Sequence, residues 1–448
     1  MAYLGSRQLS ATSAFVQSAG AKLLIIGLNA ATGILAARAL APAGRGELSA
    51  MMLWYMILGS LFSLGIPSAL TYRLRRHPEQ VSELSGAALL FALATSVVAV
   101  AVGFVGMPHW IPQYSPEVLF FARVFLLNTP VAVFVVIGRA ALESQGDFSA
   151  SNLSLIGPPV LTLAGLLLLL WTHAFTPVNA AWCYVLSGVP PLIWMSRSFY
   201  RAVRPRFRHL HKSTLLLLSY GIRSYGIDLC GTLSLYVDQA LVVRILQPGL
   251  MGTYVVALSL SRMLNAFHTA VVMVLFPRAV SRPPREVIEM TGRAVRMTTF
   301  ATTLCGAGIM LAGPRLLVLL YGSQYGGAAA ILRILVIEVI LAGATQVMSQ
   351  AFMALSRPGV ITILQAIGLL LTVPLMLVLV PRFGIEGAAF SLLLSTCARF
   401  AFVLASFSRF LDLPRPGLLP RRADLLFLFD EASRRLRALQ PSVAGGEA

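Results

Sequence analysis

Charged residues are scarce in this chain. Asp, Glu, Lys and Arg make up 12% of its 448 residues, 57% are hydrophobic, and the mean hydropathy is +0.79. Soluble domains carry about 25% charged residues, so most of the surface of this protein does not face water. The stretches 84–116 and 148–196 contain no Asp, Glu, Lys or Arg at all. This composition excludes an ordinary soluble enzyme or soluble binding module.

Patterns that would hold a metal or a nucleotide are also missing. The four cysteines are far apart in sequence, no Cys-x-x-Cys occurs, and each cysteine falls inside an apolar run. We therefore expect them to be small packing residues and not disulfides or metal ligands. No loop of the type Gly-x-x-x-x-Gly-Lys is present, which excludes ATP hydrolysis by this chain. We expect no bound cofactor.

Long apolar runs make up most of the sequence. A helix needs about 20 apolar residues to cross a bilayer, and the chain holds about twelve such runs. The first run is too long for the core of a cleavable signal, so we expect it to be a first span. We predict an all-α polytopic membrane protein with about twelve transmembrane helices, in two six-helix lobes around a central cavity. The predicted spans are 13–37, 47–72, 84–106, 117–142, 151–172, 178–197, 214–246, 250–277, 290–312, 328–355, 359–380 and 386–408.

The placement of the basic residues predicts the orientation. The net charge is +18, which in a soluble protein would suggest nucleic acid. Here, if the N-terminus is cytoplasmic, the inner loops carry most of the arginines, and the outer turns hold little more than Arg45, Arg315 and Arg382. This is the positive-inside bias, and it predicts a multi-pass protein with both termini cytoplasmic. No basic domain with interleaved aromatic residues lies outside the predicted spans, so we expect no nucleic-acid partner.

One motif occurs twice, about half the chain apart. Arg38-x-Leu40-x-Pro42-x-x-x-Gly46 reappears as Arg244-x-Leu246-x-Pro248-x-x-x-Gly252, and each copy ends one apolar run and begins the next. A repeated helix–turn–helix signature predicts two similar helical bundles. For the tail we leave two alternatives open, a basic amphipathic helix on the membrane surface or a partly ordered segment without a role. The predicted units are an N-terminal lobe (1–197), a basic cytoplasmic linker (198–213), a C-terminal lobe (214–408) and a basic cytoplasmic tail (409–448).

Further motifs carry a resemblance to a known family. They are Ala37-Arg-Ala-Leu-Ala-Pro-Ala-Gly-Arg-Gly46, Leu64-Gly-Ile-Pro67, Val237-Asp-Gln239, Phe276-Pro-Arg278 and Gly384-Ile-Glu-Gly-Ala-Ala389. With these, residues 10–408 resemble the bacterial polysaccharide or oligosaccharide-lipid flippases. Those flippases belong to the multidrug/oligosaccharidyl-lipid/polysaccharide exporter superfamily.

The resemblance implies a transporter and not an enzyme. It implies two lobes that alternately open a cavity to each side of the bacterial inner (cytoplasmic) membrane. The implied substrate is an undecaprenyl-pyrophosphate-linked oligosaccharide for exopolysaccharide or lipopolysaccharide, moved from the cytoplasmic to the outer leaflet. The implied partners are this lipid-linked oligosaccharide and membrane lipids, with a polysaccharide polymerase and glycosyltransferases as candidates.

Cationic residues inside the predicted spans are candidates for substrate binding. Charges at membrane depth are costly and usually face a cavity or a partner, and guanidinium matches phosphate oxygens bidentately. We predict that Arg262, Lys22 and Arg223 bind the pyrophosphate. For Arg262 the resemblance adds an arginine that lines the cavity at the matching place in lipid II flippases. The alternatives are pairing of Arg262 with Asp238 or Glu338, and placement of Lys22 and Arg223 at the inner interface.

The acids and one histidine are candidates for coupling or for structural charge. Glu338 is an isolated acid at mid-span, suited to a proton relay or to a salt bridge. His268 would titrate near neutral pH unless it is only a packing residue. Asp238 is suited to a substrate role or to a link with a neighbouring arginine. Asp228 lies five residues from Arg223, too far round the helix for an ideal local pair, and is a candidate for coupling or structural charge. Arg399 is expected to reach the inner interface. Proton or sodium coupling therefore stays open.

Three other functions compete with the glycan flippase. A lipid II flippase would use the same pyrophosphate chemistry with another sugar. A drug extruder of the same superfamily would favour an apolar or acidic cavity, which the excess of intramembrane arginine argues against. A membrane polysaccharide polymerase or ligase would need catalytic groups on a sizeable outer loop, and no predicted outer segment exceeds about 15 residues.

Overall fold

The computed structural model describes residues 11–280, 282–411 and 416–417, and these residues form helices and connecting turns with no strand. The elements, in chain order, are α1 (Ala11–Leu61), α2 (Ile66–Arg76), η1 (Pro78–Gln80), α3 (Val81–Trp110), α4 (Pro116–Phe125), η2 (Leu126–Asn128), α5 (Thr129–Ser144), α6 (Phe148–Trp171), α7 (Pro177–Leu186), α8 (Val189–Val203), α9 (Leu210–Ile245), α10 (Pro248–Arg262), α11 (Asn265–Ala279), α12 (Pro284–Tyr321), η3 (Ser323–Ala328), α13 (Ala329–Ala354) and α14 (Pro358–Phe410).

Two of the longest helices are each a pair of spans. Inside α1 the backbone breaks at Ala41, with φ 58°, immediately before Pro42. Inside α14 it breaks at Gly384, with φ 59°, shortly after Pro381. Proline cannot donate the next helical hydrogen bond, and a positive φ departs from helical backbone geometry, so each break separates two helices.

The span count agrees with the prediction. Within the described residues, eight helical segments are long and apolar enough to cross a membrane, and α10 with α11 forms a further span bent by 43°. With α1 and α14 counted as two spans each, and with α9 added, the chain has twelve spans. The predicted fold class, an all-α membrane protein with two six-helix lobes, is confirmed.

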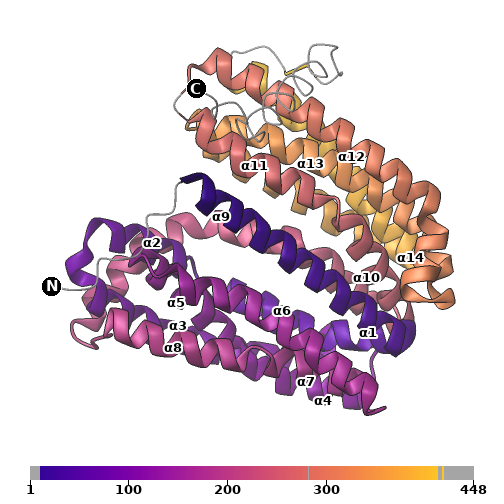
Figure 1. Cartoon of the computed structure of the whole chain (residues 1–448), viewed down its shortest axis with the longest axis horizontal. Coiled ribbons are helices and arrows are strands. Elements are labelled where there is room, and N and C mark those ends of the chain that lie inside the picture. The colour runs from indigo at the N-terminus through magenta and orange to yellow at the C-terminus, as the bar shows by residue number, and fades with distance from the viewer. Residues whose placement is uncertain (1–10, 281, 412–415, 418–448) are drawn as a thin grey trace, which may run out of the picture.

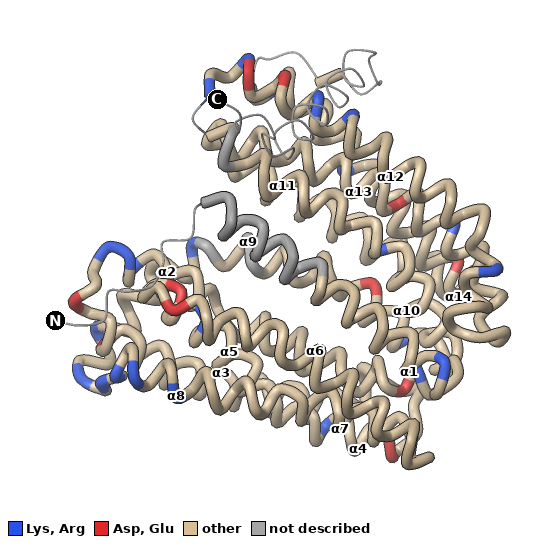
Figure 2. Tube along the Cα trace, viewed as in Figure 1, with Lys and Arg blue, Asp and Glu red and all other residues tan. Residues whose placement is uncertain are grey.

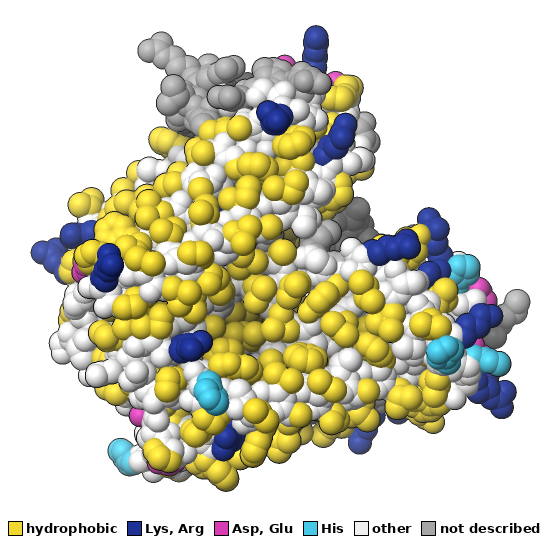
Figure 3. Space-filling model, turned by 180° about the vertical axis from the view of Figure 1, so that it is seen from behind, with side chains coloured by type: hydrophobic (Ala, Val, Ile, Leu, Met, Phe, Trp, Pro, Cys, Tyr) yellow, Lys and Arg dark blue, Asp and Glu magenta, His cyan; other side chains and the backbone are white. Residues whose placement is uncertain are grey.

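The lobes form a V (Figure 1). The N-terminal lobe contains α1 to α8 and the C-terminal lobe contains α9 to α14. Lys and Arg gather at one end of the molecule, around α2 and the C-terminal end of α8 (Figure 2), and we call this the basic end. The lobes meet at the opposite end and diverge at the basic end, where Figure 3 shows a notch between them.

The two copies of the repeated motif make the contact at the closed end of the V. A Cβ atom on Gly46 would lie 1.8 Å from the carbonyl oxygen of Pro248, and a Cβ atom on Gly252 would lie 1.9 Å from that of Pro42. Each glycine thus packs directly on the proline backbone of the other copy, as in a two-fold symmetric interface. Only glycine allows helices to approach this closely.

The hydrophobic cores follow the same division. The largest cluster of buried side chains joins both lobes around the motif turns, and contains Leu48 and Met51 of α1 with Met251 and Tyr254 of α10. A second cluster lies almost wholly in the N-terminal lobe, and a third lies in the C-terminal lobe. Packing therefore holds the lobes together around the motif turns, and elsewhere each lobe has its own core, with the first half of α9 packed into that of the N-terminal lobe.

Helix α9 connects the lobes along its length. In its first half, Leu217 belongs to the core of the N-terminal lobe, and the hydroxyl of Tyr225 donates a hydrogen bond of 2.5 Å to the carbonyl of Leu61. In its second half, Ser234 donates a hydrogen bond to the side-chain oxygen of Gln365 on α14, at 3.1 Å. A movement of one lobe against the other must therefore bend or tilt α9.

We expect Gly46→Ala and Gly252→Ala each to lower the free energy of unfolding by about 1–3 kcal/mol, the usual cost of overpacking a close contact. The added methyl group would meet backbone atoms, which cannot rotate away. Thermal unfolding in detergent would measure the loss. Gly249→Ala is the matched control, because a Cβ at Gly249 meets nothing within 4 Å. Equal stability of all three variants would contradict the close contact.

Candidate functional site

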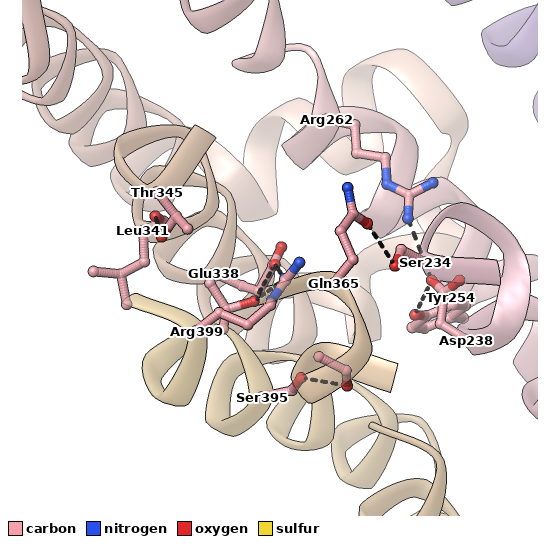
Figure 4. A network of polar contacts seen from close by, with 12 residues as sticks. Ser234, Asp238, Tyr254, Arg262, Glu338, Leu341, Thr345, Gln365, Ser395 and Arg399 are labelled. Atoms are coloured by element: carbon pink, nitrogen blue, oxygen red, sulfur yellow. Dashed lines mark hydrogen bonds and ion pairs between the residues drawn. The ribbon is translucent and has the colours of Figure 1, made fainter. Parts of the chain in front are cut away.

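A polar network lies within the apolar C-terminal lobe, on α9, α10, α13 and α14 (Figure 4). Its first pair joins Arg262 to Asp238, with 3.4 Å between Nη2 of the arginine and Oδ2 of the aspartate. The hydroxyl of Tyr254 donates a hydrogen bond of 2.8 Å to the same oxygen. The alternative in which Arg262 pairs with Asp238 is therefore the arrangement seen in this state.

The two members of this pair differ in exposure. The side chain of Asp238 is 1% exposed and that of Arg262 is 34% exposed. Arg262 is the last residue of α10, where the helix breaks before α11 begins at Asn265, so the break places the guanidinium at the edge of the packed region. Asp238 is a fixed internal charge, whereas Arg262 is accessible from outside the bundle.

Arg262 keeps most of its hydrogen-bonding capacity. A guanidinium has five N–H donors, and within the described residues its hydrogen bond to Asp238 uses one of them, at the long distance of 3.4 Å. Asp238 also keeps its contact with Tyr254 if Arg262 turns away. The arrangement can therefore offer a planar fork of donors to an incoming anion, and phosphate oxygens fit that fork well.

The second pair is more enclosed. Thr396 donates a hydrogen bond of 2.7 Å to Oε1 of Glu338, Arg399 donates one of 2.7 Å to the hydroxyl of Thr396, and Nη2 of Arg399 lies 3.8 Å from the same Glu338 oxygen. The side chains of Arg399 and Glu338 are 23% and 12% exposed. The stem of Arg399 lies against Gly368, where a Cβ would be 2.7 Å from its Cδ.

This pair corrects one prediction. Arg399 was expected to extend to the inner interface, but it turns into the bundle and meets Glu338. The reason is tertiary: Gly368 on the first half of α14 leaves room for the arginine stem, and Glu338 on α13 supplies a counter-charge. For Glu338 the salt-bridge alternative is the one that the geometry shows.

The other predicted residues do not join the network. Arg223 is exposed on the first half of α9. His268 is fully buried in the first turn of α11, packed on Gly343, and neither ring nitrogen has a hydrogen-bond partner among the described residues. The side chains of Lys22 and Asp228 lie outside the part of the chain that the structure describes.

Neutral polar residues complete the network, and sequence reasoning missed their role. Tyr254 and Thr396 each hold an acid, and Ser234 with Gln365 bridges α9 and α14. The available signal was their polarity within long apolar runs, since polar groups in a membrane need partners. Across the described ranges, no three residues among His, Cys, Asp and Glu lie close enough together to hold a metal ion.

The sequence is similar to a known protein family and to one curated relative. The sequence profile described as "Polysaccharide biosynthesis protein" matches residues 15–281. A probable low-salt glycan biosynthesis flippase, Agl15, of Haloferax volcanii is 24% identical over 217 residues, which is 47% of this chain and 45% of that protein. The match thus spans less than half the length of this curated relative.

Solved structures of transporters share the fold across most of the chain. The lipid II flippase MurJ in an inward closed conformation superposes with a TM-score of 0.74 at 14% identity, covering 93% of this chain and 91% of MurJ. A multidrug resistance MATE family transporter in an inward-facing conformation gives a TM-score of 0.68 at 17% identity, covering 85% of this chain and 94% of that transporter. At these identities the likeness shows the fold alone. Because the profile covers more than half of the sequence, the chain belongs to the polysaccharide biosynthesis protein family, within a fold shared by the MurJ and MATE transporters of the MOP superfamily.

Proposed function

We propose that the protein is a flippase that moves an undecaprenyl-pyrophosphate-linked oligosaccharide from the cytoplasmic to the outer leaflet of the bacterial inner membrane. The observation that carries the proposal is the guanidinium of Arg262, which is 34% exposed and makes one long hydrogen bond among the described residues, at the end of α10 away from the Pro248 turn. Membership of a polysaccharide biosynthesis family supports a glycan as the cargo.

The shape of the molecule supports a state in which the substrate enters between the lobes from the cytoplasmic side. The basic end faces the cytoplasm by the positive-inside rule, and this is the end at which the lobes diverge. A lipid-linked sugar assembled on the cytoplasmic leaflet enters from that side. The sugar occupies the wet notch between the lobes while the lipid chain stays in the bilayer.

Arg262 binds the diphosphate by exchanging partners. In the empty state it is held by the carboxylate of Asp238, and on loading it turns to two phosphate oxygens while Tyr254 continues to donate to Asp238. Arg223, exposed on the part of α9 that reaches the N-terminal lobe, meets the headgroup earlier on its path. Lys22 of α1 is proposed as the third cation from its place in the sequence.

The remaining titratable groups do not contact the diphosphate in this proposal. Glu338 and Arg399 neutralise each other inside the C-terminal lobe. Asp228, Asp238, Glu338 and His268 stay candidates for proton or sodium coupling. The interlobe movement would carry the headgroup outward once the Gly46 and Gly252 contact opens.

The burial of the acids distinguishes this proposal from a drug extruder. A cavity for cationic drugs would present a free carboxylate, whereas Asp238 and Glu338 are buried and paired. A lipid II flippase shares the pyrophosphate chemistry and remains the second candidate. Membership of the glycan family, and not MurJ's likeness in fold, favours the oligosaccharide.

We expect Arg262→Ala to reduce flipping in proteoliposomes by about 10- to 100-fold, because hydrogen bonds to charged groups contribute about 1.5–3 kcal/mol each. Arg262→Lys keeps the charge but loses the fork, and we expect an intermediate rate. The measurement is the appearance of a labelled lipid-linked oligosaccharide at the opposite leaflet.

Two further variants make this test decisive. Arg333→Ala removes an exposed arginine on α13 that lies on the same helix face as exposed Ile337, and it should flip normally. Arg262→Ala combined with Asp238→Asn removes the buried charge left behind, so folding is preserved and the transport defect should persist. Wild-type flipping by this folded double variant would exclude Arg262 as a phosphate ligand.

For the second pair we expect Arg399→Gln to cost about 3–5 kcal/mol of stability, because Glu338 is then left buried without its cation. Adding Glu338→Gln should recover most of that loss, since two neutral amides replace the pair. Chemical or thermal unfolding of the single and double variants, analysed as a double-mutant cycle, measures the coupling. Additive losses would show that the two residues do not interact.

A further inference from the structure

The N-terminal lobe has a groove that the proposed function does not use. It encloses about 350 Å³ between α3, α5 and α8. Leu89 and Leu93 form one wall, Leu192 and Ser196 form the other, and Val131 and Phe134 lie between them on α5. Ser196 is the one polar side chain among these six.

Two of the helices that line the groove begin at breaks within a span. Pro130 lies in the first turn of α5, directly after the 3-10 turn η2, and Pro190 and Pro191 lie in the first turns of α8 after Gly188. Proline interrupts the hydrogen-bond ladder and offsets the helix at that point. Both α3 and α8 pack on α5, and the space between their walls stays open. Figure 1 shows α3 and α8 on the side of the N-terminal lobe away from the C-terminal lobe.

The groove lies at the depth of the chains of one leaflet. Leu89 and Leu93 are about 12 and 18 Å along α3 from its first residue, and Ser196 is about 10 Å before the last residue of α8, at 1.5 Å per residue. Both of these helix termini are at the basic end. Half of a hydrocarbon layer is about 15 Å thick, so the groove faces the acyl chains of the leaflet at the basic end.

Arginines follow the groove residues of α8 toward the basic end. Arg197 directly follows Ser196 and is exposed, and Arg201 is exposed one turn further. The linker adds exposed Arg204, Arg206 and Arg208. On the other side, the acids at the start of α3 are Glu79, which contacts His77, and Glu83. Positive charge therefore dominates.

The linker is fixed against α3 at this place. The backbone N–H of Arg206 donates a hydrogen bond of 2.8 Å to the carbonyl of Ser82, and the hydroxyl of Ser82 donates one of 2.9 Å to the carbonyl of Val203. A Cβ on Gly86 would lie 2.2 Å from the carbonyl oxygen of Arg206, so the linker backbone lies directly on α3. The linker backbone at Arg206 is thus held on α3 about one turn before Leu89.

We propose that this groove binds one acyl chain of an anionic phospholipid of the cytoplasmic leaflet, with the phosphate held by Arg197, Arg201 and the linker arginines. Apolar walls alone give no preference over bulk lipid, because the bilayer is equally apolar. The selectivity comes from the cations at the surface, which attract anionic headgroups. The bound lipid ties the linker to the N-terminal lobe and is not transported.

Native mass spectrometry of the full chain, released from nanodiscs of phosphatidylglycerol and phosphatidylcholine, tests this site. We expect Val131→Trp and Leu93→Trp, which fill the groove from its floor and from its rim, to reduce retained phosphatidylglycerol at least fivefold. Leu168→Trp, an equal substitution at an exposed position of α6, should leave retention unchanged. Two variants are used because Val131→Trp alone could impair folding.

The headgroup is tested separately. Arg197→Gln with Arg201→Gln should abolish the preference for phosphatidylglycerol over phosphatidylcholine, and Arg333→Gln should not. The proposal is overturned if the folded Leu93→Trp variant retains wild-type amounts of phosphatidylglycerol, or if the wild type retains phosphatidylcholine equally well. Displacement of phosphatidylglycerol by added undecaprenyl phosphate, lost in Leu93→Trp, would assign the groove to a polyprenyl chain and would also overturn it.

Discussion

The reciprocal glycine–proline contact between the two copies of the repeated motif is the constraint on which the rest of the molecule depends. Gly46 rests on the Pro248 backbone and Gly252 on the Pro42 backbone. Inside a bilayer, helices gain little from the hydrophobic effect and associate through close packing. A pair of side-chain-free contacts at one end of two long lobes therefore determines where α1 and α10 join, and away from that end the lobes are linked through α9. The hydroxyl of Tyr325 adds a 3.0 Å hydrogen bond to the carbonyl of Ala37 at this end.

The two ion pairs of the C-terminal lobe differ in how exposed their arginine is. Glu338 and Arg399 are enclosed, and Thr396 is hydrogen-bonded to both of them. The two charges therefore neutralise each other inside the protein. Arg262 has one long contact and a third of its side chain exposed. An ion pair with one mobile and one fixed member suits a carrier, because the cation can hold substrate and then return to its carboxylate when substrate leaves. A permanently unpaired arginine at this depth would be far more costly.

Much of the fold was predictable from the sequence because each span is a local property. Apolar length, the Pro42 and Pro248 turns and the asymmetry of the arginines each act within a few residues, and together they gave twelve spans in two lobes. What was not predictable arises from contacts between distant segments. No local pattern indicates that Gly46 meets Pro248, that α9 packs on both lobes, or that Gly368 makes room for Arg399 to reach Glu338. For the same reason the sequence left open whether Arg262 pairs with Asp238 or with Glu338, since both acids are on other helices.

The need for the lobes to separate at the closed end can be measured directly. Cysteines placed at Arg38 and Leu319, whose side chain and carbonyl are 3.4 Å apart across the lobes, can be joined by a short, reducible thiol crosslinker in a chain lacking its four native cysteines. We expect the crosslinked protein to stop flipping lipid-linked oligosaccharide and to recover when the linker is reduced. Undiminished flipping while the lobes are crosslinked would contradict an alternating opening of this contact.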